Sequence, residues 1–185
     1  KAVVIPNSIK TIGSFAFKDC KNLENILYES PITNLAEGVF KGCSSLNHYP
    51  YFNQTVSVGP EAFVGTSIEE INDESFSNPD VFSSVVSQCD NLKNLTISSP
   101  KNFSNMKGNI KSRSFTLMPQ IDLVHAHAFQ NSVIGTLIFQ AQEIDLKPGA
   151  FLNASIQMME ASSQTLEIKD RNFVIQKNDL IYVLS

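Results

Sequence analysis

Charge is scarce in this sequence of 185 residues. Charged residues make up 17% of the chain, against a usual share of about 25%, and the formal net charge is −4. A chain that is 42% hydrophobic and carries so little net charge buries its apolar groups, which excludes an intrinsically disordered protein. The slight acidic excess also argues against nucleic acid as the main partner, because phosphate binding needs clustered Lys and Arg.

Long apolar runs and catalytic fingerprints are absent as well. Stretches such as IGTLIF and LIYVL have the length of β-strands and fall short of the roughly 18 to 20 residues that a transmembrane segment needs. The sequence contains no G-x-S-x-G, H-E-x-x-H, P-loop or dinucleotide-binding motif, and its three His residues are scattered. We therefore expect no enzymatic activity, no catalytic or metal-binding residues and no cofactor.

What the sequence does contain is a repeat of about 23 residues. Phe17, Phe40 and Phe63 are spaced by 23 residues, as are Cys20 and Cys43. Each repeat carries an L-x-x-L-x-L-like segment, whose middle apolar residues are Val3, Ile26, Tyr49, Ile71, Leu95, Phe115, Leu137, Met159 and Ile181. Eight or nine residues before the next such residue stands a bulky side chain: Phe17, Phe40, Phe63, Val86, Met106, Phe129, Phe151 and Phe173. The pattern is least regular over residues 73–121, where Asp73 interrupts it.

A period of 20 to 29 residues with this layout is typical of leucine-rich repeats, in which each unit forms one short strand, a turn and a looser return. A single unit cannot bury its own apolar edge and must stack on a copy of itself. We therefore predict a strand-rich leucine-rich-repeat solenoid of the α/β class. It should have a parallel concave β-sheet of about nine short strands, with irregular or short helical returns on the convex side. Residues 1–185 should form a single array of about eight units.

The repeat pattern I-P-x-S-I-x-x-I-G-x-x-A-F-x-x-C-x-x-L-x-x-I resembles the BspA-like, treponemal-type leucine-rich repeats. Residues 5–26 match this pattern closely and residues 30–49 match it well. The units that end at Ile71 and Leu95 match in part, and from Phe103 onward the spacing and the terminal Phe remain. The resemblance implies an adhesion or recognition module that is located at a cell surface or secreted, and it supplies no catalytic residue.

The three cysteines occupy one position of the repeat, and Cys20 and Cys43 belong to adjacent repeats. A disulfide or a metal site is one interpretation of this placement. The count is odd and no C-x-x-C spacing occurs. We favour the other interpretation, in which Cys20, Cys43 and Cys89 are small buried side chains packed against the sheet, since unpaired cysteine is among the most buried residue types.

His125 and His127 form an H-x-H pair within VHAHAF. Such a pair can bind a metal, but two ligands fall short of the four that are usual for zinc. Their position in the turn favours a solvent-facing pair. Four N-x-S/T sequons also occur at about the frequency expected by chance, and so give no firm indication of secretion: Asn53, Asn94, Asn102 and Asn153.

The register of the repeat predicts which side chains face outward from the concave sheet. Along the chain these residues change from acidic to basic and then to partly apolar, and exposed apolar groups on one face often mark an interaction surface. A solvated sheet also needs polar side chains, which is the alternative explanation. The candidate partner-binding residues are Glu24, Asn47, His48, Glu69, Glu70, Lys93, Arg113, Ile138, Met158 and Tyr182.

Two classes of function fit this sequence. We favour a recognition module that binds a protein or glycan ligand through the concave sheet, and the alternative is a structural scaffold or spacer within a larger assembly. The chain opens on KAVVIP and closes on LIYVLS, both of which resemble strands, and neither end carries a capping segment. We therefore expect a segment of a longer array, or end-to-end self-association through exposed strand edges.

Overall fold

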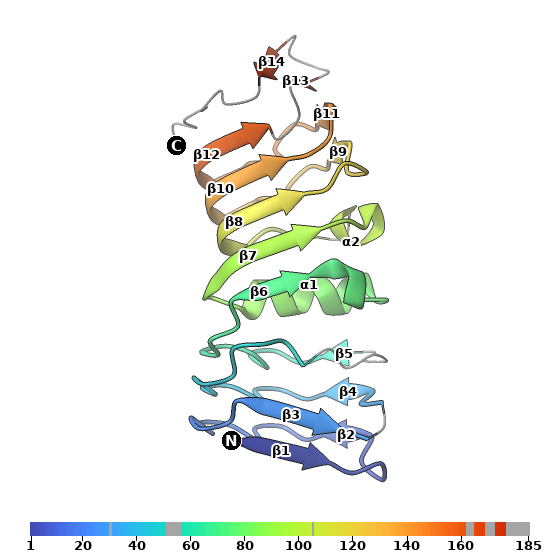
Figure 1. Cartoon of the computed structure of the whole chain (residues 1–185), viewed down its shortest axis with the longest axis vertical. Coiled ribbons are helices and arrows are strands. Elements are labelled where there is room, and N and C mark those ends of the chain that lie inside the picture. Colours follow the sequence, from blue (N-terminus) through green and yellow to red (C-terminus); the bar gives the residue numbers. More distant parts are fainter. Residues whose placement is uncertain (30, 51–56, 105, 162–164, 169–172, 177–185) are drawn as a thin grey trace. The chain divides into compact units, whose positions relative to one another are not determined.

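The computed structural model describes residues 1–29, 31–50, 57–104, 106–161, 165–168 and 173–176 (Figure 1). Its contacts divide the chain into two compact units. The first unit consists of Lys1–Ile71 and Ser75–Leu92, and the second of Asn72–Glu74 and Lys93–Ser185. Fully buried apolar side chains occur in both units, so each has a core of its own.

The first unit contains short parallel strands of two kinds. Its elements are β1 (Ala2–Ile5), β2 (Thr11–Ile12), β3 (Asn25–Tyr28), β4 (Asn34–Leu35), β5 (Ser57–Val58) and the helix α1 (Pro79–Gln88). The L-x-x-L-x-L segments form β1 and β3, which pair in parallel with Val3 opposite Ile26. The return segments form β2, β4 and β5, a three-stranded parallel sheet in which Ile12 lies opposite Leu35. Residues one repeat apart are therefore direct neighbours in both sheets.

The second unit repeats this arrangement with longer strands. Its elements are β7 (Leu92–Ile97), α2 (Pro100–Ser104), β8 (Lys111–Leu117), β9 (Leu123–Val124), β10 (Val133–Phe139), β11 (Glu143–Leu146), β12 (Ser155–Ala161), β13 (Thr165–Ile168) and β14 (Phe173–Gln176). One sheet has the order β12-β10-β8-β7, and the other has the order β14-β13-β11-β9. β10 pairs in parallel with β8 and β12, whereas β13 and β14 are antiparallel. β6 (Glu70–Asn72) and the 3-10 turn Asp73–Ser75 contribute residues to both units.

The expected strand-rich fold with parallel sheets and few helices is confirmed, but the described strands do not form one continuous sheet, and the ninth expected strand, around Ile181, lies outside the described residues. They fall into separate sheets, and the returns contain short strands of their own, beyond the irregular or helical segments that were predicted. In the third repeat, Pro50 occupies the position of Leu27, and proline has no N–H to donate to a strand ladder. Among the described residues of this repeat segment, which end at Pro50, the pairing consists of an isolated parallel bridge between His48 and Glu70.

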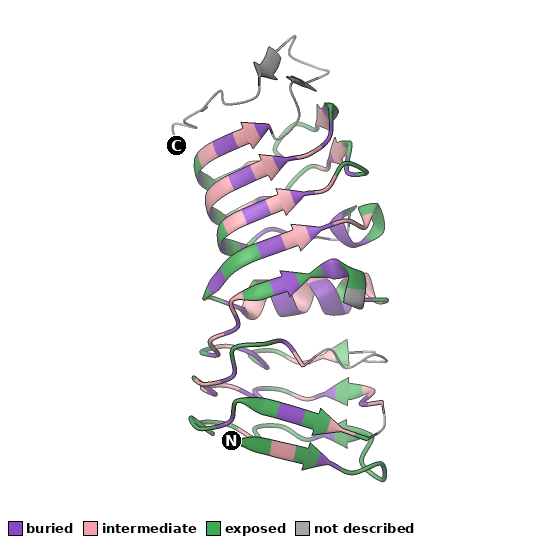
Figure 2. Ribbon diagram, in the orientation of Figure 1, coloured by how far each residue is buried: buried purple, intermediate pink, exposed green. Residues whose placement is uncertain are grey.

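Phenylalanines one repeat apart stack in the core of the first unit. The ring centroids of Phe17 and Phe40 are 5.5 Å apart, and those of Phe40 and Phe63 are 5.6 Å apart. Phe40 and Phe63 are completely buried, whereas Phe17 is half-buried because a neighbouring turn covers only one of its sides among the described residues. Figure 2 shows buried, intermediate and exposed stretches along the strands and turns of this unit. By transfer free energy, each fully buried Phe contributes about 1.5–3 kcal/mol.

The turns that carry these phenylalanines are joined by backbone hydrogen bonds. The N–H groups of Phe17 and Asp19 donate to the carbonyls of Val39 and Lys41 at 2.9 and 2.8 Å. The N–H group of Phe40 donates to the carbonyl of the next turn in the same way. Every bond of this ladder therefore runs from one turn to the following turn.

Each turn also needs left-handed backbone at two positions four residues apart. In the second turn these positions are Gly38 and Gly42, with φ of 57° and 74°. In the first turn they are Phe15 and Asp19, with φ of 58° and 57°. Glycine adopts this conformation without steric cost, whereas other residues adopt it rarely. The spacing of the glycines thus follows from the path of the turn.

Candidate interaction surface

The strands of the second unit separate buried from uncovered side chains. In β8, Phe115 and Leu117 are completely buried, Arg113 is exposed and Thr116 is half-buried. Over residues 114–117 this pattern follows from strand geometry, in which successive side chains point to opposite faces. Arg113 and Ser114 are two consecutive uncovered residues between the buried Ser112 and Phe115. We define the sheet face of the second unit as the residues between the buried positions of β7, β8, β10 and β12: Lys93, Asn94, Thr96, Arg113, Ser114, Thr116, Gly135, Thr136, Ile138, Gln157, Met158 and Glu160.

The pairing of the strands places these residues in rows across the sheet. Thr136 on β10 lies opposite Ser114 on β8 and opposite Met158 on β12. Neighbours in such a row are about 4.8 Å apart. A second row consists of Thr116, Ile138 and Glu160. The sheet face thus presents hydroxyl groups beside two apolar side chains.

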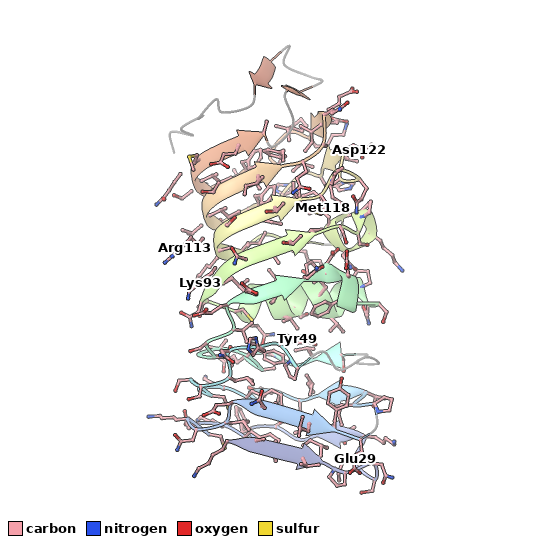
Figure 3. The ribbon with its side chains drawn as sticks, in the orientation of Figure 1. Glu29, Tyr49, Lys93, Arg113, Met118 and Asp122 are labelled. Atoms are coloured by element: carbon pink, nitrogen blue, oxygen red, sulfur yellow. The ribbon has the colours of Figure 1, made fainter. Side chains whose placement is uncertain are left out.

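Two cations lie on adjacent strands of this face. Lys93 on β7 and Arg113 on β8 are both exposed, and their side chains project from the same part of the sheet (Figure 3). Gly135 on β10 stands beside Arg113, where a Cβ atom would lie 2.5 Å from the Arg113 carbonyl oxygen. A side chain at position 135 therefore does not fit without a shift of the backbone. The acidic side chain of this face, Glu160, belongs to β12.

The candidate residues of the second unit lie on this face as far as the structure describes them. Lys93 and Arg113 are exposed, and Ile138 and Met158 are half-buried. Tyr182 lies outside the described residues. The structure therefore brings four of the candidates together on one sheet.

In the first unit the candidate residues are mostly exposed. Glu24, Asn47, His48 and Glu70 are exposed, and Glu69 is half-buried. The bridge between His48 and Glu70 places these two residues on neighbouring segments. Glu24 directly precedes β3, so it lies two segments before Glu70 in the order of the repeats.

An exposed apolar pair on the first two strands was not among the candidates. Val4 on β1 and Leu27 on β3 are register partners, and their exposed fractions are 57% and 56%. Both occupy the outward position between two inward residues. The 23-residue spacing of Val4 and Leu27 was the signal that could have identified this pair from the sequence.

The buried acid of the second unit is Asp73, the residue that interrupts the repeat pattern. Its Oδ1 accepts hydrogen bonds from the N–H and the hydroxyl of Ser98, both at 2.8 Å. Its Oδ2 accepts from the N–H of Ser99 at 2.8 Å and from the side-chain amide of Asn102 at 3.3 Å. Asp73 and Asn102 are both buried. The carboxylate therefore fixes the backbone before α2, and Asn102 serves as a core donor.

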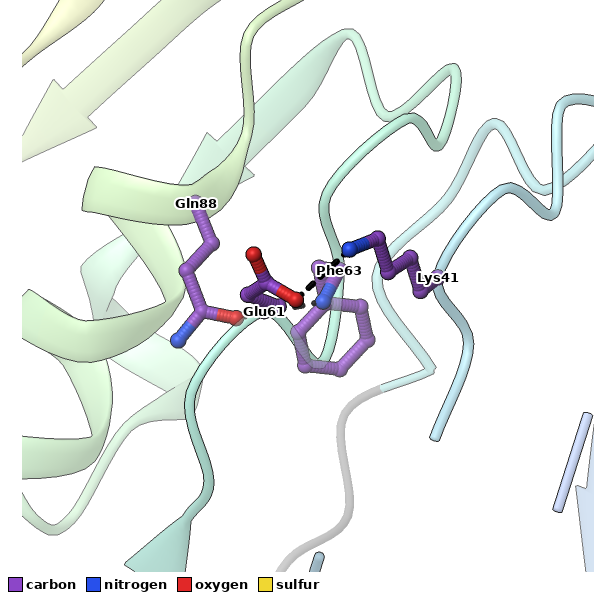
Figure 4. A network of polar contacts seen from close by, with 4 residues as sticks. All are labelled: Lys41, Glu61, Phe63 and Gln88. Carbon is purple, nitrogen blue, oxygen red and sulfur yellow. Dashed lines mark hydrogen bonds and ion pairs between the residues drawn. The ribbon is translucent and has the colours of Figure 1, made fainter. Parts of the chain in front are cut away.

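At the third turn of the first unit, the next segment is the helix α1. The N–H of Phe63 donates to Gln88 Oε1 at 3.1 Å (Figure 4). Gln88 Nε2 donates to the carbonyl of Gly59 at 3.1 Å. In the two preceding turns the equivalent N–H donates to a backbone carbonyl. The side-chain amide of Gln88 thus replaces a peptide group, next to an ion pair of 2.6 Å between Lys41 and Glu61.

The two histidines of the H-x-H pair differ in exposure. His127 is exposed and has a φ of 65°, whereas His125 is half-buried. Among the described residues, no group of three or more His, Cys, Asp and Glu side chains is placed to hold a metal ion.

The cysteines are buried at two of their three positions. Cys43 and Cys89 are buried, as predicted, and burial raises the pKa of their thiols to about 11 and about 12. The prediction is wrong for Cys20, which is exposed. Cys20 belongs to the first turn, which is covered by a neighbouring turn on one side only in the described part of the chain.

Short strands that pair in parallel at intervals of one repeat, together with stacked phenylalanines, define a repeat protein whose units bury their apolar edges on one another. A family model described as BspA type Leucine rich repeat region (6 copies) matches residues 1–93 and 101–182. The chain therefore belongs to the BspA-type leucine-rich repeat family, which confirms the resemblance found in the sequence. Neither the curated proteins nor the solved structures gave a match. None of the helices in the described ranges is long and apolar enough to cross a membrane.

Proposed function

We propose that this chain is a non-catalytic recognition module, located at a cell surface or secreted, that binds a protein or glycan ligand through the outward residues of its parallel strands. Its family consists of repeat modules for protein interaction. The observation that carries the proposal is the separation of buried and uncovered side chains within single strands. In β8 the core is made by Phe115 and Leu117, so Arg113 and its neighbours are available for binding at no cost to the core.

The chemistry of the sheet face suits a ligand that carries acceptor groups. Lys93 and Arg113 are cations, and Ser114, Thr116 and Thr136 supply hydroxyl groups at regular spacing. Carboxylate, sulfate and carbonyl groups accept hydrogen bonds from such donors, and charged partners strengthen them. Proteins and glycans both present these groups, whereas nucleic acid is disfavoured by the net charge of −4.

The test begins with binding of the purified chain to a glycan array and to a panel of immobilised cell-surface ectodomains. We expect Lys93→Glu combined with Arg113→Glu to weaken the binding found there by about tenfold or more, because charge reversal on an interface repels a complementary ligand. The melting temperature should not change, since both side chains are exposed.

The matched control is Lys101→Glu combined with Lys107→Glu. These exposed residues belong to the same unit and give the same change of charge, but they lie on α2 and in the turn that follows it. Glu69→Lys combined with Glu70→Lys tests the first unit in the same assay. If the control pair weakens binding more than either sheet pair does, the binding site lies on the returns and the proposal is wrong.

A structural scaffold is the second candidate, and a depression beside the first turn favours it. β1 pairs with β3 along one edge, and beside it lies a depression of about 600 Å³ whose lining includes Val3, Phe17 and Leu23. A second copy of the chain could cover these groups and produce end-to-end association. Light scattering over a range of protein concentrations tests this candidate. A mass that stays monomeric at all concentrations contradicts it.

A further inference from the structure

The first and second turns of the first unit place Cys20 and Cys43 next to each other. The two residues are equivalent in the repeat, and the ladder bonds from Phe17 and Asp19 hold their turns together immediately before Cys20. Backbones joined by such bonds are about 4.8 Å apart. Disulfides bridge Cα atoms that are about 4.4–6.8 Å apart, so the spacing of the turns is compatible with a bond.

The thiol of Cys43 points toward the first turn. Its Sγ donates a hydrogen bond to the carbonyl oxygen of Phe17 at 3.0 Å. The N–H of Cys20 donates to the same oxygen at 3.1 Å. One oxygen atom therefore binds both the sulfur of one cysteine and the backbone of the other. Burial is the main cause that raises the pKa of Cys43, while the Cys20 amide lowers it and the charges of Cys20 and Asp19 raise it further.

This orientation is not shared by the third turn. There the equivalent residue is Thr66, whose hydroxyl donates to the carbonyl of Phe63 in its own turn at 2.8 Å. Cys89, the third cysteine, is buried and has Thr66 rather than a cysteine at the equivalent position one repeat earlier. Cys20 and Cys43 are therefore the two cysteines that adjacent turns bring together.

We propose that Cys20 and Cys43 form a disulfide that joins the first two turns. Cys20 is exposed and lines the depression of about 600 Å³, together with Lys21, so a small disulfide such as oxidised glutathione can reach it. The Cys20 thiolate attacks one glutathione sulfur, which forms a mixed disulfide and releases one glutathione. The Cys43 thiolate then attacks the Cys20 sulfur and releases the second glutathione. In the net reaction two protein thiols are oxidised, and one oxidised glutathione is reduced to two thiols.

The test uses the full chain, fully reduced and then incubated with oxidised glutathione under native conditions. Free thiols are then alkylated in denaturant, and the peptides are mapped by mass spectrometry without reduction. We expect a peptide in which Cys20 is linked to Cys43, while Cys89 is alkylated. The oxidised chain should also unfold at a higher urea concentration than the reduced chain, because the bond restricts the unfolded chain.

Single variants separate this result from other thiol chemistry. Cys43→Ser should retain a stable glutathione adduct on Cys20, Cys20→Ser should remain fully reduced at Cys43, and Cys89→Ser should behave like the parent. The proposal is overturned if the parent keeps the adduct on Cys20 with Cys43 alkylated, or if both thiols stay reduced. A linkage that includes Cys89, or a Cys20–Cys20 bond between two chains, overturns it as well.

Discussion

The turns at Phe17 and Phe40 and the segment from Asp73 to α2 satisfy their backbone groups in different ways. In the turns, a peptide N–H meets a peptide carbonyl one repeat later, and no particular side chain is needed for the bond. In the segment after Asp73, a carboxylate accepts from two backbone N–H groups. Gln88 in α1 likewise supplies an amide where a further turn would supply a peptide group. Regular repeats therefore depend on spacing, whereas the irregular segments depend on single polar residues.

The largest effect expected from this comparison is that of Asp73→Ala. The substitution leaves the N–H groups of Ser98 and Ser99 without their acceptor and removes the carboxylate partner of the Asn102 amide, which keeps its bond to the Asp73 carbonyl. We expect a loss of about 3–5 kcal/mol in the free energy of unfolding. Urea denaturation measures this loss. Asp122→Ala, at an exposed position of the same unit, is the control and should change stability by less than about 0.5 kcal/mol. Equal losses for the two variants would show that the buried carboxylate is not needed.

Within the regular repeats, the loss of stability expected when a phenylalanine is replaced by alanine depends on how many neighbouring turns cover its ring. Phe40→Ala should lower the free energy of unfolding by about 3–5 kcal/mol, because Phe40 is completely buried between Phe17 and Phe63. Phe17→Ala should cost roughly half as much, since Phe17 is half-buried. Thermal and urea unfolding of both variants measure the ratio of the two losses in the free energy of unfolding. A greater loss for Phe17→Ala would contradict the order of burial.

Gln88→Leu tests the replacement of a peptide group by a side chain. It leaves the N–H of Phe63 and the carbonyl of Gly59 without their partner, which should cost about 1–3 kcal/mol. Gln88→Glu should fall between the parent and Gln88→Leu, because it keeps the acceptor but has no donor for Gly59. Urea denaturation orders the three proteins, and Ser87→Ala on the exposed side of α1 serves as the control. If the Gln88→Glu and Gln88→Leu variants are equally stable, the side-chain acceptor for the N–H of Phe63 contributes nothing to the free energy of unfolding.

The smallest effect concerns the backbone of the turns. Gly65 has a φ of 73°, so Gly65→Ala should cost about 1–2 kcal/mol through backbone strain. Gly13→Ala is the matched control, because a Cβ atom at Gly13 meets no other atom within 4 Å and its φ is not positive. The difference between the two melting temperatures measures the strain. A loss at Gly13 as large as at Gly65 would mean that chain flexibility, and not φ, determines the cost.

The sequence predicted the parts of the structure that follow from spacing. The 23-residue intervals of Phe17, Phe40 and Phe63 predicted that successive repeats stack, and the L-x-x-L-x-L segments predicted parallel strands. Pro50 indicates that the strand of its repeat lacks one N–H donor, but the prediction of nine strands was based on the spacing of apolar residues and did not take Pro50 into account. For this reason one continuous sheet of nine strands was expected, whereas the described strands fall into separate sheets.

The polar contacts of the irregular segments could not be predicted in the same way. Asp73 was identified as an interruption, yet its partners depend on the path of the backbone before α2, which no periodicity describes. Gln88 reaches Gly59 only because α1 replaces a turn. Cys20 has the same type and repeat position as Cys43, but the exposure of a side chain depends on its neighbouring turns. Residue type fixed none of these environments by itself.

The uniform direction of the turn hydrogen bonds has an electrostatic consequence. Each N–H of the ladder points toward the following turn and each carbonyl toward the preceding one, as the bonds of Phe17 and Phe40 show. The dipoles of these peptide groups therefore add from turn to turn, as they do along an α-helix. Among the described turns, the first is the negative end of this alignment, and its Lys18 and Lys21 outnumber its one acid, Asp19. A row of turns is in this respect polarised along its stacking direction, and a cation is favoured at the end where the carbonyls emerge.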